Sequence, residues 1–216
     1  MKNIVIIGAG TFIGGAILKE ALFRGNRVKA IIGENEKIPV FSSKVQVVYA
    51  DVLKEEGLYR HIIGNDSVIS AFRCEYSNPN VYQETLDANI RILESLRKAN
   101  VKRYHLVGTS GSLMFTSKKK FLESSDFPSQ FLPCSMAMDK FYEDILKYEK
   151  EVDWVYLCPS ANIHFGQRTE KFRIGTDAIM SDENGVSAIS VEDYAVALLD
   201  DLDLSLHHRE AFTVGY

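Results

Sequence analysis

The 216-residue sequence predicts an α/β fold in which a doubly wound parallel sheet forms a single domain, residues 1–216. Residues 4–7 are a continuous run of β-branched apolar side chains, as a strand buried on both faces requires. Glycines follow that run directly, and apolar residues then recur at helical spacing over residues 16–23. Strand and helix patterns alternate along the rest of the chain, which is typical of a parallel sheet covered by helices on both faces.

Further apolar runs of strand length predict strands at residues 27–32, 45–50, 67–72, 103–107, 153–159 and 211–214. Helices are expected over about residues 53–63, 80–99 and 135–150, and from residue 190 onward. We expect the Rossmann strand order 3-2-1-4-5-6-7, with the seventh strand at the edge of the sheet. In such a sheet a ligand lies across the carboxyl ends of the strands, where the order reverses between strands one and four.

The composition argues against several classes of protein. A net charge of -4 does not suit a general nucleic-acid binder, because phosphate contacts need clustered lysine and arginine. Cys74, Cys134 and Cys158 lack metal-ligand spacing with the histidines, so we expect reduced thiols and no metal site. No segment approaches the ~18 apolar residues of a membrane span, and we expect a soluble, cytoplasmic protein. A homodimer is compatible with the sequence, which gives no evidence for or against it.

Residues 8–14, Gly-Ala-Gly-Thr-Phe-Ile-Gly, form a glycine turn between the first strand and the first helix. Glycine permits a sharp turn and the close approach of a diphosphate, and the helix N-terminus attracts that anion. The turn resembles the GATGFIG motif of extended and atypical short-chain dehydrogenases/reductases, with Thr11 in place of the middle glycine. We therefore expect NAD or NADP to bind at Gly8, Gly10, Thr11, Phe12, Ile13 and Gly14. A strand-to-helix turn without a ligand is the alternative.

The nucleoside half of the cofactor is expected at the ends of the second, third and fourth strands. Glu34 lies 20 residues beyond Gly14, where a carboxylate accepts hydrogen bonds from the ribose hydroxyls and favours NAD. Lys37 nearby would suit NADP, and an exposed loop position fits Glu34 equally well. The family resemblance implies that Asp51 and Val52 contact the adenine, although Asp51 also fits the N-cap of the next helix. At the end of the fourth strand, the residues expected to approach the cofactor ribose are Ser70, Ala71 and Phe72.

The same resemblance implies a serine after the fifth strand and a Tyr-x-x-x-Lys pair on the next helix. In that family the tyrosine moves a proton, the lysine lowers the tyrosine pKa and holds the ribose, and the serine polarises the carbonyl. Ser110 and Ser112 stand in the serine's place, and Lys140 has the spacing of the lysine. Met136 replaces the tyrosine, and its thioether cannot exchange a proton. At ~100° per residue, Tyr142 points about 120° away from Met136 and does not substitute for the tyrosine.

The segment over about residues 160–188 is expected to shape the substrate side of the site. It is polar and rich in turns, and an Asn-Gly pair at residues 184–185 predicts a hairpin. His164, Arg168 and Arg173 are candidates for contacting an anionic or aromatic substrate, and a structural role fits each of them as well.

The short chain and the missing tyrosine make the sequence similar to atypical reductases described as NADH-flavin reductase-like or sugar-epimerase-like. A ketone or alcohol needs a proton beside the hydride, whereas a flavin delocalises the charge and takes its proton from water. We therefore expect NAD(P)H-dependent hydride transfer to a small-molecule acceptor, which is a flavin such as FMN or FAD, a quinone or a similar conjugated molecule. A nucleotide-sugar epimerase or dehydratase and a non-catalytic NAD(P)-sensing protein are the alternatives.

Overall fold

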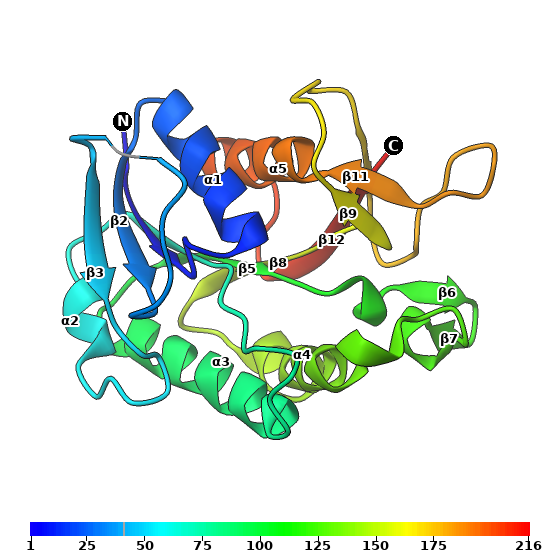
Figure 1. Ribbon diagram of the computed structural model, residues 1–216, viewed down its shortest axis with the longest axis horizontal. Helices are drawn as coiled ribbons and strands as arrows, with labels where there is room; N and C mark the ends of the chain where they lie inside the picture. The colour runs from blue at the N-terminus through cyan, green and yellow to red at the C-terminus, as the bar shows by residue number, and fades with distance from the viewer. Residues whose placement is uncertain (41) are drawn as a thin grey trace.

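The computed structural model describes residues 1–40 and 42–216 and has a central eight-stranded sheet (Figure 1). The strand order is β10-β12-β8-β5-β4-β1-β2-β3, and all neighbouring strands are parallel except β10 and β12. These strands are β1 (Asn3–Ile7), β2 (Arg27–Ile32), β3 (Val45–Tyr49), β4 (Ser67–Ser70), β5 (Arg103–Val107), β8 (Asp153–Cys158), β10 (Arg173–Gly175) and β12 (Glu210–Gly215). The doubly wound order predicted from the sequence is confirmed for the strands from β3 to β12.

Helices cover both faces of the sheet (Figure 1). On one face lie α1 (Phe12–Phe23) and α5 (Val191–Leu204), and on the other lie α2 (Leu58–Ile62), α3 (Val81–Lys98) and α4 (Leu132–Asp144). Short 3-10 turns are η1 (Ser110–Ser112), η2 (Phe121–Glu123), η3 (Ser129–Phe131) and η4 (Leu146–Tyr148). Because side chains alternate along a strand, Ile4 and Ile6 pack into the α1–α5 core, while Val5 and Ile7 pack into the opposite core. This is why β1 is apolar at consecutive positions.

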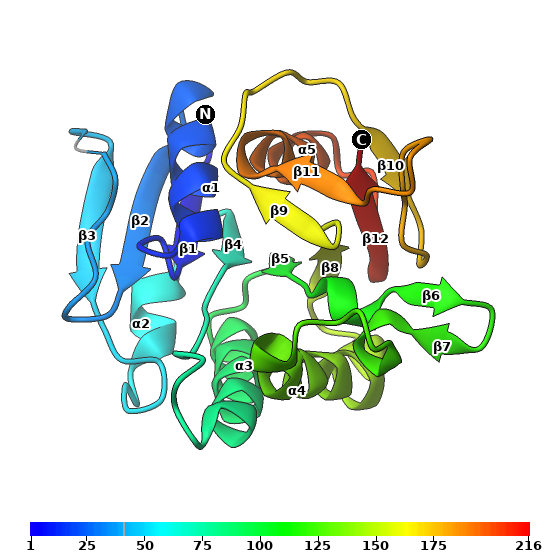
Figure 2. The same cartoon turned by 45° about the vertical axis from the view of Figure 1, so that its right-hand side comes forward.

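Two small sheets follow the carboxyl ends of central strands (Figure 2). After β5, β6 (Met114–Thr116) pairs antiparallel with β7 (Lys119–Lys120). After β8, β9 (Asn162–His164) pairs in parallel with β11 (Ala188–Ser190). Among residues 1–40 and 42–216, no helix combines the length and the apolar character needed to cross a membrane.

Three expectations about the elements are wrong. β10 pairs with β12 and takes the edge position that was expected for the seventh strand. The helix expected over residues 53–63 is only α2, because the Asp51 carboxylate closes a turn onto the Leu53 N–H at 2.9 Å instead of capping a helix. The Asn-Gly pair at residues 184–185 lies in a turn between β10 and β11, and these two strands belong to different sheets.

Candidate functional site

The glycine turn is fixed against the ends of β2 and β4. The Gly8 N–H donates to the Ile31 carbonyl at 2.8 Å, and Gly8 has a φ of +79°. A Cβ at Gly8 would lie 2.6 Å from the Ala71 carbonyl oxygen, and a Cβ at Gly14 would lie 2.0 Å from the Gly8 carbonyl oxygen. Both positions therefore require glycine, which brings the first turn of α1 close to the switch point between β1 and β4.

Thr11, which replaces the middle glycine of the family motif, caps α1. Its hydroxyl oxygen accepts from the Gly14 N–H at 3.1 Å and donates to the Gly8 carbonyl at 2.8 Å. The same hydroxyl lies 3.2 Å from the carbonyl of Ala71, which directly follows β4. The cap satisfies one free N–H of the helix and leaves the positive end of its dipole facing the carboxyl edge of the sheet.

A cavity of about 560 Å³ opens at the carboxyl ends of β1, β2 and β3, and we call it the β1–β3 cavity. Its volume lies in the ~300–1,000 Å³ range of sites that bind small molecules and cofactors. Residues that the sequence predicts for cofactor binding line it together: Gly8, Thr11, Glu34, Asp51, Val52 and Phe72. The structure thus brings the glycine turn and three strand ends into one cavity.

The remaining residues predicted for the cofactor lie around this cavity. Ser70 is fully buried in β4, and Ala71 is buried where its backbone meets the glycine turn. Ile13 is partly buried and packs against the α1–α5 core. Gly10 and Phe12 line a separate groove of about 480 Å³ along the outer face of α1.

Acidic side chains outnumber basic ones in the β1–β3 cavity, which is lined by Glu34, Glu36, Asp51 and Glu55 and by Lys54 and Arg73. Burial raises the pKa of Asp51, but its ion pair with Lys54 at 3.0 Å and the Leu53 N–H outweigh burial and lower it. Sequence reasoning missed Glu36, whose carboxylate accepts from the Gly33 N–H at 3.1 Å. A Cβ at Gly10 would lie 3.0 Å from the same carboxylate oxygen, so Glu36 stands beside the glycine turn while Glu34 is exposed.

The predicted serines lie on η1, directly after β5, and are both half-buried. The Ser112 hydroxyl lies 3.3 Å from the hydroxyl of Tyr156 on β8. One residue before η1, the Thr109 hydroxyl lies 2.8 Å from that of Ser135 on α4. Uncharged hydroxyl groups from β8, η1 and α4 are therefore linked in pairs at the carboxyl end of β5.

The sequence indicates only that Tyr156 belongs to an apolar strand. In the structure its phenol lies next to the Ser112 hydroxyl. Its ring is fully buried and stacks on the Tyr142 ring with centroids 4.7 Å apart. Burial holds the pKa of Tyr156 well above its usual value and raises that of Tyr142 to about 12. Neither phenol can ionise near neutral pH, so neither replaces the proton-exchanging tyrosine of the short-chain dehydrogenases.

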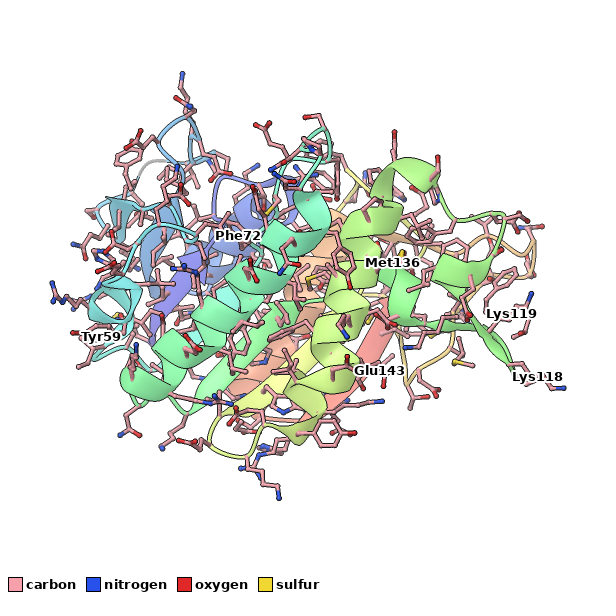
Figure 3. The ribbon with its side chains drawn as sticks, turned by 90° about the horizontal axis from the view of Figure 1, so that it is seen from below. Tyr59, Phe72, Lys118, Lys119, Met136 and Glu143 are labelled. Carbon is pink, nitrogen blue, oxygen red and sulfur yellow. The ribbon has the colours of Figure 1, made fainter. Side chains whose placement is uncertain are left out.

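Met136 and Lys140 lie on the solvent side of α4, whereas Ala137 and Met138 between them are buried. Met136 is 46% exposed, and Figure 3 shows it on the α3–α4 layer seen from outside the sheet. The Lys140 ammonium pairs with the Asp144 carboxylate one turn further on, at 2.5 Å. The buried face of this helix instead carries Ser135, which is one residue before Met136. The structure therefore does not bring Lys140 to the β1–β3 cavity.

Two of the three candidates for substrate contact, Arg168 and Arg173, are held by hydrogen bonds within the protein. Arg168 donates two hydrogen bonds to the Glu20 carboxylate, at 2.7 and 2.9 Å, which ties the loop after β9 to α1. Arg173 on β10 donates to the Ser181 and Tyr216 carbonyls. His164 is exposed at the end of β9, and its ring nitrogen Nδ1 lies 2.9 Å from the next carbonyl. Within the described ranges, no group of three or more potential ligands is arranged to hold a metal ion.

Comparisons with known proteins agree with this geometry. A family model described as NAD(P)H-binding matches residues 8–202. Protein YwnB of Bacillus subtilis is 32% identical over 215 residues, which cover 98% of this chain and 97% of YwnB. A crystal structure from Bacteroides thetaiotaomicron, described as a candidate epimerase, is 41% identical with a TM-score of 0.92 and covers 100% of this chain and 97% of its own. A candidate NADH-flavin reductase from Streptococcus pneumoniae is 26% identical with a TM-score of 0.85 over 100% and 99% of the two chains.

Proposed function

The chain belongs to the NAD(P)H-binding family, and we propose that it is a reductase that transfers a hydride from NADH to a conjugated acceptor. The acceptor is a flavin, a quinone or a similar ring system that spreads the added charge by delocalisation. The glycine turn and the β1–β3 cavity support the cofactor half of this proposal, and the end of β5 supports the acceptor half.

The residues at the glycine turn fit a dinucleotide diphosphate. A side chain at Gly8 or Gly14 would fill the space that the backbone needs, and the α1 N-terminus supplies N–H groups and a positive dipole end. The β1–β3 cavity would hold the adenosine, with Asp51 and Val52 at its adenine side. Its excess of carboxylates, including Glu34 and Glu36, would repel a 2′-phosphate, which supports NADH over NADPH.

The hydroxyl groups at the end of β5 are the reason for proposing a reductase of conjugated acceptors. When bound, the reduced nicotinamide supplies a hydride. The half-buried hydroxyl groups of Thr109 and Ser112 orient the acceptor and donate hydrogen bonds, while the buried hydroxyl groups of Ser135 and Tyr156 pair with them. None of the four is an acid or base near neutral pH. Such a site handles an acceptor that needs positioning and takes its proton from water, rather than a ketone or an alcohol.

An epimerase is the second candidate, because the Bacteroides relative that is 41% identical is described as a candidate epimerase. Epimerisation through a bound nicotinamide requires a group that takes the proton of the sugar hydroxyl as the hydride leaves its carbon, and returns it when the ketone is reduced again. Burial raises the pKa of the Tyr156 phenol, and Met136 points outward, and neither feature favours that chemistry.

The test is anaerobic oxidation of NADH or NADPH by the purified protein, followed by absorbance with FMN, menadione or a UDP-sugar present. We expect faster NADH oxidation with FMN or menadione than in the same mixture without protein, and slower oxidation of NADPH. Conversion of the UDP-sugar would support the epimerase instead. NADH binding without turnover of any acceptor would support a sensing protein and overturn the reductase.

A further inference from the structure

The Tyr156 ring is fully buried between neighbouring groups. Its ring lies between the backbone of Gly108, where a Cβ would come within 2.9 Å of its Cζ, and the Tyr142 ring. The planes of the two stacked rings differ by only 9°, and Trp154 meets the edge of Tyr142 at 6.0 Å. This packing places the phenol oxygen next to the Ser112 hydroxyl, at 3.3 Å.

The direction of the hydrogen bond between the two hydroxyls follows from their chemistry. A phenol is the better donor and an aliphatic hydroxyl the better acceptor, and the buried Tyr156 phenol stays protonated. Since the Ser112 oxygen accepts from Tyr156, the proton of this half-buried hydroxyl remains available for donation to another group.

We propose that Tyr156 is a positioning residue that orients the Ser112 hydroxyl as a hydrogen-bond donor to the acceptor. This inference rests on the proposed reductase function. As the hydride adds to the acceptor, negative charge develops on its conjugated system, and a fixed donor stabilises that charge. NADH becomes NAD⁺, the acceptor gains the hydride, and water supplies the proton that completes its reduction. Tyr156 and Ser112 keep their protons throughout.

The experiment is a double-mutant cycle of Ser112→Ala and Tyr156→Phe, with Tyr142→Phe as the matched control. The control removes a hydroxyl from the same ring stack, but from the ring that does not meet Ser112. We expect Ser112→Ala to lower kcat by about 100-fold, as for a lost transition-state donor. Tyr156→Phe should lower it by about tenfold and leave the dissociation constant of NADH unchanged, while Tyr142→Phe changes neither. In the Ser112→Ala background, Tyr156→Phe should have no further effect.

A second readout avoids turnover. Titration of the NADH-free protein with FMN, followed by flavin fluorescence, should give about fivefold weaker binding for Tyr156→Phe only when Ser112 is present. Tyr156 has no positioning role if its variant and the Tyr142→Phe control have equal kcat and FMN affinity, or if its effect persists without Ser112. A wild-type protein that oxidises no NADH with any acceptor would instead overturn the reductase proposal, and the inference with it.

Discussion

Replacing Gly8 with alanine tests whether the glycine turn is held against the end of β4. Gly64 is the matched control, because it has a φ of +78° against +79° for Gly8 and open space where its Cβ would lie. A left-handed alanine costs ~1–2 kcal/mol at either site. At Gly8 the Cβ would also lie 2.6 Å from the Ala71 oxygen and 2.8 Å from the Phe72 amide nitrogen. These are backbone atoms that cannot rotate away, so overpacking adds ~1–3 kcal/mol.

Urea unfolding should therefore give a loss of ~1–2 kcal/mol for Gly64→Ala and of ~2–5 kcal/mol for Gly8→Ala. Because Phe72 lines the β1–β3 cavity, its displacement should also weaken NADH binding by about tenfold in calorimetry. Gly64→Ala should leave the NADH affinity unchanged. Equal losses of stability in the two variants, with equal NADH affinities, would refute the placement of the turn against β4.

Three further predictions concern ionisable groups. Glu36→Gln should reduce the preference for NADH over NADPH by about tenfold in calorimetry, and Glu34→Gln should reduce it much less. The reason is that only the Glu36 carboxylate is fixed beside the glycine turn. A larger effect of Glu34→Gln than of Glu36→Gln would contradict this role of Glu36. Lys140→Ala should leave NADH affinity within about twofold, since Lys140 pairs with Asp144 on the surface; a tenfold loss would show that it reaches the ribose. Burial lowers the pKa of His105 from 6.5, so the unfolded chain binds protons more readily and stability should fall as the pH drops below 6.5. His105→Gln should flatten this dependence in urea titrations, and an unchanged dependence would exclude His105 as its source.

Local sequence signals were sufficient for the centre of the fold. The run from Ile4 to Ile7 has one possible environment, a strand between two cores, and left-handed Gly8 marks the turn that follows. β10 could not be predicted, because Arg173–Gly175 has no apolar run and becomes a strand only by pairing with β12. Nonlocal pairing of that kind leaves no trace in a short segment.

The candidate site, like the fold, was only partly predictable from local sequence signals. The spacing of Met136 and Lys140 matches the family pattern, but spacing does not determine which face of α4 meets the sheet. A helix rotates by ~100° per residue, so a shift of one position exposes Met136 and buries Ser135. The role of Tyr156 could not be predicted for a related reason. Its hydroxyl gains a partner only when η1 folds over the end of β8.

The most direct measurement is an anaerobic single turnover in which protein loaded with NADH is mixed with an equal amount of FMN. If the glycine turn holds NADH beside an acceptor site, NADH and oxidised flavin should disappear together in a one-to-one ratio, faster than without protein. Disappearance of neither, with NADH demonstrably bound, would contradict hydride transfer to a flavin by this protein.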